Sequence, residues 1–172
     1  GIAKGYTADC LIGIFRGYGC VSACTNLGGD VAVLGRRPDG GPWRVGIRHP
    51  RREGCLLGAV MAEDCAVVTS GDYARFFVDA GGRRCHHLID PRTGYPADSG
   101  LVSVTVAAPG AVAADALSTA LFVAGLEEGK ELIKEFVGTD AVFMDINGAV
   151  FLTDGMVGRF MPENGITANE LA

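Results

Sequence analysis

The spacing of apolar and polar positions divides the chain into a helical start, a strand-rich middle and a second half that mixes helices and strands. Residues 3–16 carry apolar side chains three and four positions apart, which predicts an amphipathic helix that ends at Gly17 and Gly19. Short apolar runs follow, separated by turns rich in glycine and proline, and they predict a meander of strands. These runs cover residues 21–27, 31–34, 43–47, 56–62 and 66–69.

The second half begins with a predicted two-stranded hairpin, in which residues 76–78 pair with residues 87–89 across the turn at 80–82. An alternating strand then ends where Pro109-Gly110 breaks the pattern. Asn147-Gly148 is a strong signal for a tight turn, and it predicts a last hairpin. The expected elements are a strand at 102–107, helices at 111–124 and 126–137, and paired strands at 141–146 and 149–152.

The order of these elements predicts an α+β fold, an antiparallel sheet with packed helices. The 172 residues contain no repeat, linker or low-complexity segment, so we expect a single domain spanning residues 1–172. Gly1 enters the first helical pattern with no approach segment. We therefore expect the chain to begin within a longer protein.

Composition and charge narrow the function classes. The formal net charge is −5, and the basic residues form no run longer than the pairs Arg51-Arg52 and Arg83-Arg84, so we expect no nucleic-acid partner. No apolar run reaches the roughly 18–20 residues of a bilayer-spanning helix.

The six cysteines show no CxxC pair and no histidine at zinc-finger spacing, which argues against a structural zinc site. Most of them lie in apolar runs, so we expect buried, reduced thiols, although their even number leaves disulfides open. They are Cys10, Cys20, Cys24, Cys55, Cys65 and Cys85.

Chemistry-bearing residues concentrate in the stretch HHLIDPRTGYP, residues 86–96. Asp90-Pro91 favours a turn, Thr93-Gly94 tolerates positive φ and Pro96 stiffens the exit, so the turn would hold His86, His87 and Asp90 rigidly. An alternative interpretation is an ordinary β-turn in which the Asp90 side chain hydrogen-bonds to nearby backbone, and it accounts for the same residues.

Two further candidates are weak when taken singly. Asp115 and Thr119 lie four residues apart on one helix face, and their oxygens suit Mg²⁺ or Ca²⁺, although a helix-dipole contact and a back-bonded threonine are equally consistent. The glycines of Asn26-Leu27-Gly28-Gly29-Asp30 would let backbone amides approach a nucleotide, or would simply form a tight turn.

Taken together and in order, five motifs closely resemble the ApbE-like FAD:protein FMN transferases. They are Gly1-Ile2-Ala3-Lys4-Gly5-Tyr6 with Asp9, Asn26-Leu27-Gly28-Gly29-Asp30, Ser70-Gly71-Asp72-Tyr73, the stretch 86–96, and Ala114-Asp115-Ala116-Leu117-Ser118-Thr119. The resemblance implies the T-fold-like architecture of that family, represented here by its C-terminal portion. It also implies Mg²⁺-dependent cleavage of FAD and transfer of FMN to a threonine of an acceptor flavoprotein, such as a subunit of a membrane redox complex.

The resemblance assigns roles residue by residue. Asp115 and Thr119 resemble the Mg²⁺ ligands, with a main-chain carbonyl at Gly1 as a third. His87 and Asp90 would orient the phosphate or accept the proton of the threonine nucleophile. The expected contacts of FAD are Lys4, Tyr6, Asp9, Asn26, Gly28, Gly29, Asp30, Ser70, Gly71, His87 and Thr93.

Two alternatives to the transferase remain: a Mg²⁺-dependent FAD pyrophosphatase that releases FMN and AMP, and a non-catalytic flavin-binding fragment. Family members carry a further N-terminal segment that helps to close the flavin pocket, and without it we expect weak FAD binding and self-association. By the same resemblance the protein would work on the periplasmic side of the inner membrane, with the cytoplasm as the alternative.

Overall fold

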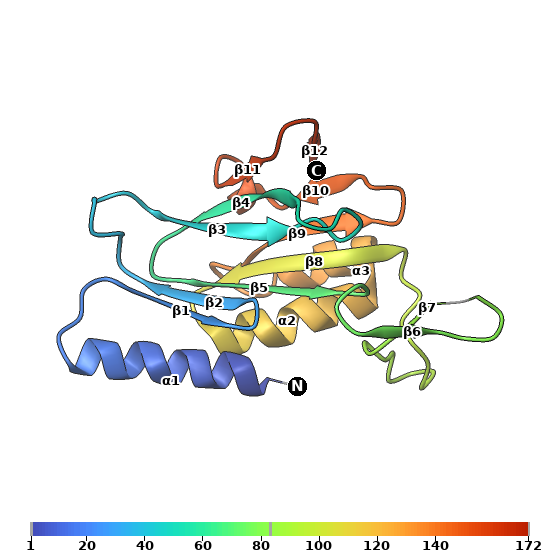
Figure 1. Cartoon of the computed structure of the whole chain (residues 1–172), viewed down its shortest axis with the longest axis horizontal. Helices are drawn as coiled ribbons and strands as arrows, with labels where there is room; N and C mark the ends of the chain where they lie inside the picture. The colour runs from blue at the N-terminus through green and yellow to red at the C-terminus, as the bar shows by residue number, and fades with distance from the viewer. Residues whose placement is uncertain (1, 83, 172) are drawn as a thin grey trace.

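The computed structural model describes residues 2–82 and 84–171, which form three layers (Figure 1). Three helices cover one face of a seven-stranded sheet, and a three-stranded sheet covers the other. The helices are α1 (Ala3–Gly17), α2 (Ala111–Ala124) and α3 (Leu126–Ile133), with a short 3-10 helix η1 (Asp154–Met156). This architecture confirms the predicted α+β class.

The large sheet has the strand order β1-β2-β5-β8-β9-β10-β12. Neighbouring strands run antiparallel from β1 to β10, and β12 is parallel to β10. Its strands are β1 (Ala23–Leu27), β2 (Asp30–Leu34), β5 (Ala66–Gly71), β8 (Leu101–Ala108), β9 (Asp140–Asp145), β10 (Val150–Leu152) and β12 (Ala168–Glu170).

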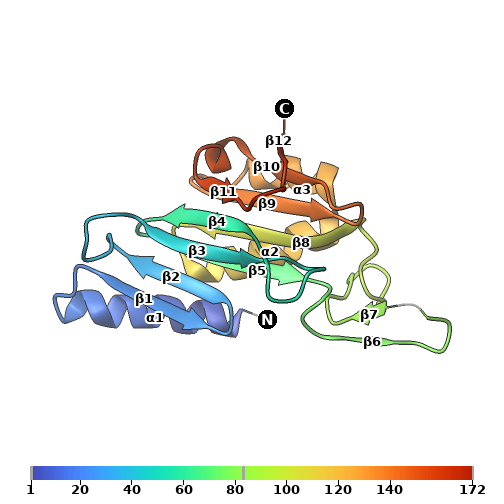
Figure 2. The same cartoon turned by 45° about the horizontal axis from the view of Figure 1, so that its top comes forward.

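Two smaller sheets complete the fold. The three-stranded sheet has the order β11-β4-β3, and a peripheral two-stranded ribbon pairs β6 with β7 (Figure 2). Their strands are β3 (Trp43–Arg48), β4 (Leu56–Ala62), β11 (Phe160–Pro162), β6 (Phe76–Val78) and β7 (Arg84–His86).

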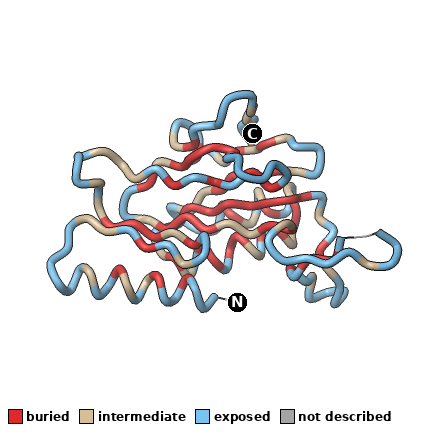
Figure 3. Tube along the Cα trace, in the orientation of Figure 1, coloured by how far each residue is buried: buried red, intermediate tan, exposed pale blue. Residues whose placement is uncertain are grey.

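The core lies on both faces of the central strand β8, of which every residue is buried (Figure 3). Val104 and Val106 pack toward the helices with Phe122, whereas Val102 packs toward the small sheet with Val60. A strand buried on both faces reads as a nearly continuous apolar run, which explains why β8 was readily predicted. Among the described residues, no helix has both the length and the hydropathy to cross a membrane.

The predicted pairing of residues 76–78 with 87–89 is wrong. Phe76 pairs with His86 and Val78 with Arg84, so the partner strand lies three residues closer to the turn. Residues beyond His86 are drawn away because Leu88 is buried in the helix-side core and Ile89 bridges to Pro96.

Two other expectations also need correction. The helix predicted at 126–137 ends at Ile133, because the N–H groups of Lys134, Glu135 and Phe136 bond to carbonyls three residues back instead of four. The cysteines are mostly not buried. Cys10, Cys20, Cys24 and Cys55 are exposed and Cys65 is half-buried, all five without a disulfide, and Cys85 is buried.

Candidate active site

The predicted ligand residues Asp115 and Thr119 lie on α2, where it faces the start of α1 and the end of β5. The Asp115 carboxylate accepts a hydrogen bond from the Gly5 N–H through Oδ2 at 3.0 Å. A side chain at Gly5 could not fit, because a Cβ there would lie 2.5 Å from the Ala111 carbonyl oxygen. Glycine at this position therefore lets the two helices touch and keeps Asp115 in place.

Asp30 brings a second carboxylate to the same place. It is only 2% exposed, its Oδ1 accepts a hydrogen bond from Lys4 Nζ at 2.6 Å, and its Oδ2 is buried without any hydrogen-bond partner. Burial raises the pKa of Asp30, Lys4 opposes this, and the nearby charge of Asp115 raises the pKa further. Two carboxylates here face one ammonium, which leaves an excess of negative charge.

A hydroxyl cluster closes the other side of the site. The Ser70 hydroxyl, near the end of β5, lies 2.8 Å from that of Ser118 and 3.0 Å from that of Thr119. Gly71 must be small here, because a Cβ would lie 2.4 Å from the Tyr73 ring. The structure therefore brings together Lys4, Asp30, Ser70, Asp115 and Thr119, and we call these five residues the carboxylate cluster.

The glycine pair forms the turn that positions Asp30. Gly28 and Gly29 have φ values of +64° and +102°, and they link β1 to β2 in a two-residue hairpin loop. The Asn26 side chain accepts a hydrogen bond from the Gly29 N–H at 2.9 Å. The prediction that these residues border the flavin remains a prediction, but the turn explains why glycines occur there.

Asp9 has a structural task that the sequence did not reveal. Its carboxylate accepts hydrogen bonds from the N–H groups of Ala111 at 2.7 Å and Val112 at 3.0 Å, and so caps α2, whose own N-cap residue is Gly110. Its predicted flavin contact, like that of Tyr6, remains a prediction. Tyr6 is 64% exposed on α1. The predicted carbonyl ligand at Gly1 lies outside the described residues.

The stretch 86–96 forms a second group, which continues from β7 of the peripheral ribbon (Figures 1 and 2). The Asp90 carboxylate accepts a hydrogen bond from the Arg92 N–H at 2.9 Å and pairs with the Arg92 guanidinium, and these bonds lower the pKa of Asp90. The Thr93 hydroxyl accepts from the Tyr95 N–H. These are the contacts of an ordinary turn, which was the alternative interpretation of this stretch from the sequence.

The two adjacent histidines have opposite environments. His86 is buried against Phe122, and its Nε2 lies 3.0 Å from the Ala97 carbonyl oxygen while Nδ1 accepts the Leu88 N–H. His87 is exposed, and its Nδ1 lies 3.2 Å from the Arg75 carbonyl oxygen. A carbonyl can only accept, so this contact assigns the donor role to Nδ1 of His87, and in the neutral ring with that assignment the lone pair is on Nε2. His87 therefore suits a proton acceptor, and His86 is structural.

No three side chains of histidine, cysteine, aspartate or glutamate converge on a metal position within residues 2–82 and 84–171. A magnesium site here would therefore combine carboxylate, hydroxyl and carbonyl oxygens. The residues fit such an ion, because Asp115 and Thr119 supply hard oxygens beside the unpartnered oxygen of Asp30.

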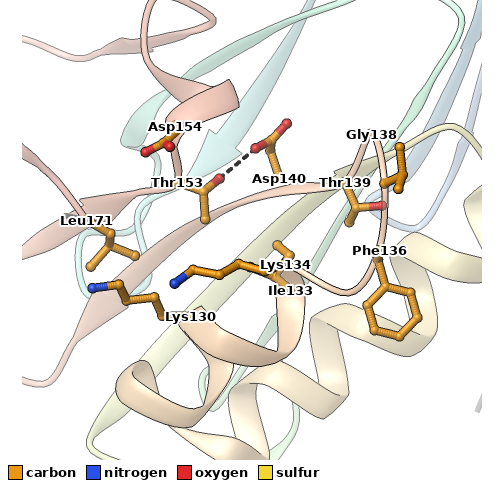
Figure 4. Close-up of a pocket in the computed structure, with 11 residues that line it drawn as sticks. Lys130, Ile133, Lys134, Phe136, Gly138, Thr139, Asp140, Thr153, Asp154 and Leu171 are labelled. Atoms are coloured by element: carbon orange, nitrogen blue, oxygen red, sulfur yellow. Dashed lines mark hydrogen bonds between the residues drawn. The ribbon is translucent and has the colours of Figure 1, made fainter.

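A separate cavity of about 460 Å³ lies between α3 and η1 (Figure 4). Lys130 and Lys134 extend along its floor, and the Thr153 hydroxyl donates to Asp140 above them. None of the predicted site residues lines it.

Comparisons with known proteins agree with this arrangement. Residues 1–143 match the model of the ApbE family. An FAD:protein FMN transferase from Treponema pallidum is 41% identical over 92% of this chain and 46% of its own, and one from Klebsiella pneumoniae is 37% identical over 94% and 49%.

Solved structures give the same result. An ApbE protein from Thermotoga maritima superposes with a TM-score of 0.83 at 37% identity, covering 92% of this chain and 51% of its own. The flavinyl transferase ApbE of Pseudomonas stutzeri gives 0.76 at 35% identity, covering 92% and 50%. The chain thus spans about half the length of the relatives that it matches, and by sequence and by fold it belongs to the ApbE family.

Proposed function

We propose that this chain carries the metal and phosphate half of a Mg²⁺-dependent FAD:protein FMN transferase. FAD is the substrate, and a threonine hydroxyl of an acceptor flavoprotein receives FMN. Relatives bearing that name support the reaction class. The observation that carries the proposal is the carboxylate cluster, in which family positions distant in sequence converge with excess negative charge.

The charge balance explains why a cation is needed. Asp30 and Asp115 face a single ammonium, that of Lys4, and FAD would add the negative charges of its pyrophosphate. Asp115, Thr119 and the Gly1 carbonyl would hold Mg²⁺, which would polarise the phosphorus and neutralise charge on the departing AMP. The Gly5 N–H and the Ser70 hydroxyl hold the two side-chain ligands in position.

The stretch 86–96 would supply the proton acceptor. Nε2 of His87 is free to take the proton from the threonine hydroxyl, because Nδ1 is held by the Arg75 carbonyl. The ion pair of Asp90 with Arg92 would stiffen the turn that presents His87. The threonine oxygen would then form a bond to the phosphorus of the FMN half, the pyrophosphate bond would break, and AMP would leave while His87 holds the proton.

The test is in-gel flavin fluorescence of a threonine-bearing acceptor protein incubated with FAD, Mg²⁺ and the complete gene product. Fluorescence that depends on Mg²⁺ and is lost when the threonine is changed to alanine supports the transferase. Release of FMN and AMP without labelling would identify the pyrophosphatase, and FAD binding without cleavage would identify a flavin-binding fragment.

A further inference from the structure

A cleft of about 690 Å³ lies between the β3–β4 connection and the β6–β7 ribbon. We call it the arginine cleft, and its principal lining residues are Arg48, Arg51, Arg52, Arg84, Tyr73 and Phe76. Four guanidinium groups surround one cavity in a chain whose formal net charge is −5. The sequence showed only the pairs 51–52 and 83–84, and the fold joins these two regions to the end of β3.

Most of this positive charge is not neutralised. Arg51 donates to both oxygens of Asp72 at 2.7 and 2.6 Å, and Asp72 is only 8% exposed, so this pair is a fixed part of the wall. Among the described residues, Arg48, Arg52 and Arg84 have no carboxylate partner, and Glu53 at the rim is the acidic residue that lines the cleft with them. Three guanidinium groups are therefore available to an anion.

Aromatic side chains add apolar walls. Phe76 is 45% exposed, and the Arg84 guanidinium lies 3.9 Å from the centre of its ring, which keeps Arg84 at the cavity. Tyr73 is half-buried, and burial raises the pKa of its hydroxyl, so that it stays a neutral hydrogen-bond donor. The cleft thus offers guanidinium groups that can bind carboxylates and aromatic rings that can contact an apolar side chain.

The proposed proton acceptor is held next to one wall of the arginine cleft, because His87 Nδ1 lies 3.2 Å from the carbonyl oxygen of Arg75, the chain neighbour of Phe76. Phe76 is the register partner of His86, so one wall of the cleft and the stretch 86–96 belong to the same ribbon. Arg84 and Asp72 also line a smaller cavity of about 240 Å³ together with His86. A polypeptide held in the arginine cleft would therefore pass close to His87.

We propose that the arginine cleft binds an acidic segment of the acceptor protein and thereby presents its threonine to the site. This inference rests on the proposed function. Four of the 15 lysine and arginine residues gather at this one cleft of an acidic chain, which suits a short acidic segment and disfavours a long polyanion. Carboxylates would bind Arg48 and Arg52, and an apolar residue of the segment would lie against Phe76.

The test compares charge reversals on one strand of the complete gene product. Arg48→Glu, at the end of β3, alters the cleft, and Arg44→Glu makes the same charge change on the same strand outside it. We expect Arg48→Glu to raise KM for the acceptor about tenfold or more with little change in kcat, because rim charges act on encounter and binding. Arg52→Glu should do the same, and Arg44→Glu should not.

A binding measurement separates this inference from the proposed function. Fluorescence anisotropy would follow a short labelled peptide of glutamate and leucine, with glutamine in place of glutamate as the control. We expect binding to the native protein that weakens with salt and is lost in Arg48→Glu. Such binding by a protein that labels no acceptor would overturn the transferase but support the cleft as an acidic-peptide site. Equal binding of both peptides, undiminished binding by Arg48→Glu, or displacement by AMP would overturn the inference.

Discussion

The carboxylate cluster and the stretch 86–96 contribute to the proposed site in different ways. In the carboxylate cluster, side chains are fixed by contacts between distant segments: Gly5 with Asp115, Lys4 with Asp30, and Ser70 with Thr119. In the stretch 86–96, Asp90 and Thr93 bond to residues within three positions of themselves. The carboxylate cluster is thus built by the tertiary fold. In the stretch 86–96 the turn at Asp90 and Thr93 is local, whereas the two histidines before it are tied to other segments of the chain.

This difference suggests different roles: the carboxylate cluster suits electrostatic binding of a metal ion, and the stretch 86–96 suits contact with the acceptor protein. The two buried carboxylates, of which Asp30 has one oxygen without a hydrogen-bond partner, exert a strong electric field because little water screens them, and such a field suits the binding of a metal ion. An exposed turn can be reached by a second protein, which suits proton transfer from an acceptor. We therefore expect substitutions in the carboxylate cluster to affect the metal step and those in the stretch 86–96 to affect transfer to the acceptor.

The largest effect is expected at Asp115. Asp115→Asn keeps the size of the side chain and an oxygen that can accept the Gly5 N–H, but removes the charge of the proposed metal ligand. Flavin labelling of the acceptor should fall by about 10³-fold or more, because Lewis-acid stabilisation contributes several kcal/mol. The measurement is in-gel fluorescence across a Mg²⁺ titration, with thermal unfolding as the control for folding. Full labelling by Asp115→Asn in the presence of a chelator would show that this face of α2 is not the metal site.

The next effect distinguishes the adjacent histidines. His87→Ala should lower the rate of transfer by about 10²–10⁴-fold and change FAD binding far less, because a general base acts in the transition state. His86→Ala should instead lower the free energy of unfolding by about 2–4 kcal/mol, since it removes a buried ring and its hydrogen bond to Ala97. Transfer rates, FAD titrations and chemical denaturation of both variants provide the measurement. Unchanged transfer by a folded His87→Ala would assign both histidines to the structure.

Burial also determines which elements of the fold could be predicted from the sequence. Helix α2 was predicted with its observed bounds, and β8 nearly so, because their apolar patterns are dictated by burial. The pairing of β6 was wrong by three residues, since every residue of β6 is exposed and no buried face fixed its register. Strands β11 and β12 were not predicted, and each has only three residues.

For the site, the sequence supplied the residue types but not their partners. Asp115 and Thr119 were placed on one helix face by their spacing alone. The approach of Lys4 to Asp30, 26 positions apart, required the tertiary fold. The capping of α2 by Asp9 spans more than a hundred positions, and a signal existed in Gly110, which cannot cap the helix with its own side chain. The arginine cleft was missed because its cations come from separate segments.

Thr119 should show a smaller, metal-dependent effect. Thr119→Val preserves the shape of the side chain but removes the hydroxyl that lies 3.0 Å from Ser70 Oγ, and Thr119→Ser keeps a hydroxyl as the control. We expect labelling by Thr119→Val to fall about tenfold at limiting Mg²⁺ and to recover partly at high Mg²⁺, because a neutral ligand contributes less than a carboxylate to a hard cation. Loss of activity that no Mg²⁺ concentration relieves, with Thr119→Ser equally affected, would contradict a role as ligand.

The smallest effect concerns the pH dependence of stability at Asp30. Burial and Asp115 raise the pKa of Asp30 despite Lys4, so between the ordinary pKa of about 4 and the raised one the folded protein keeps a proton that the unfolded chain has lost. The contribution of Asp30 to stability is therefore largest at low pH and declines as the pH rises through its folded pKa. Asp30→Asn should flatten this decline, and Lys4→Met should steepen it and cost about 1–2 kcal/mol at pH 7, because it leaves a buried carboxylate uncompensated. Urea denaturation of the three proteins from pH 4 to neutrality measures the slopes. Parallel slopes in all three would mean that Asp30 titrates as it does in the unfolded chain, and that neither burial nor Asp115 raises its pKa.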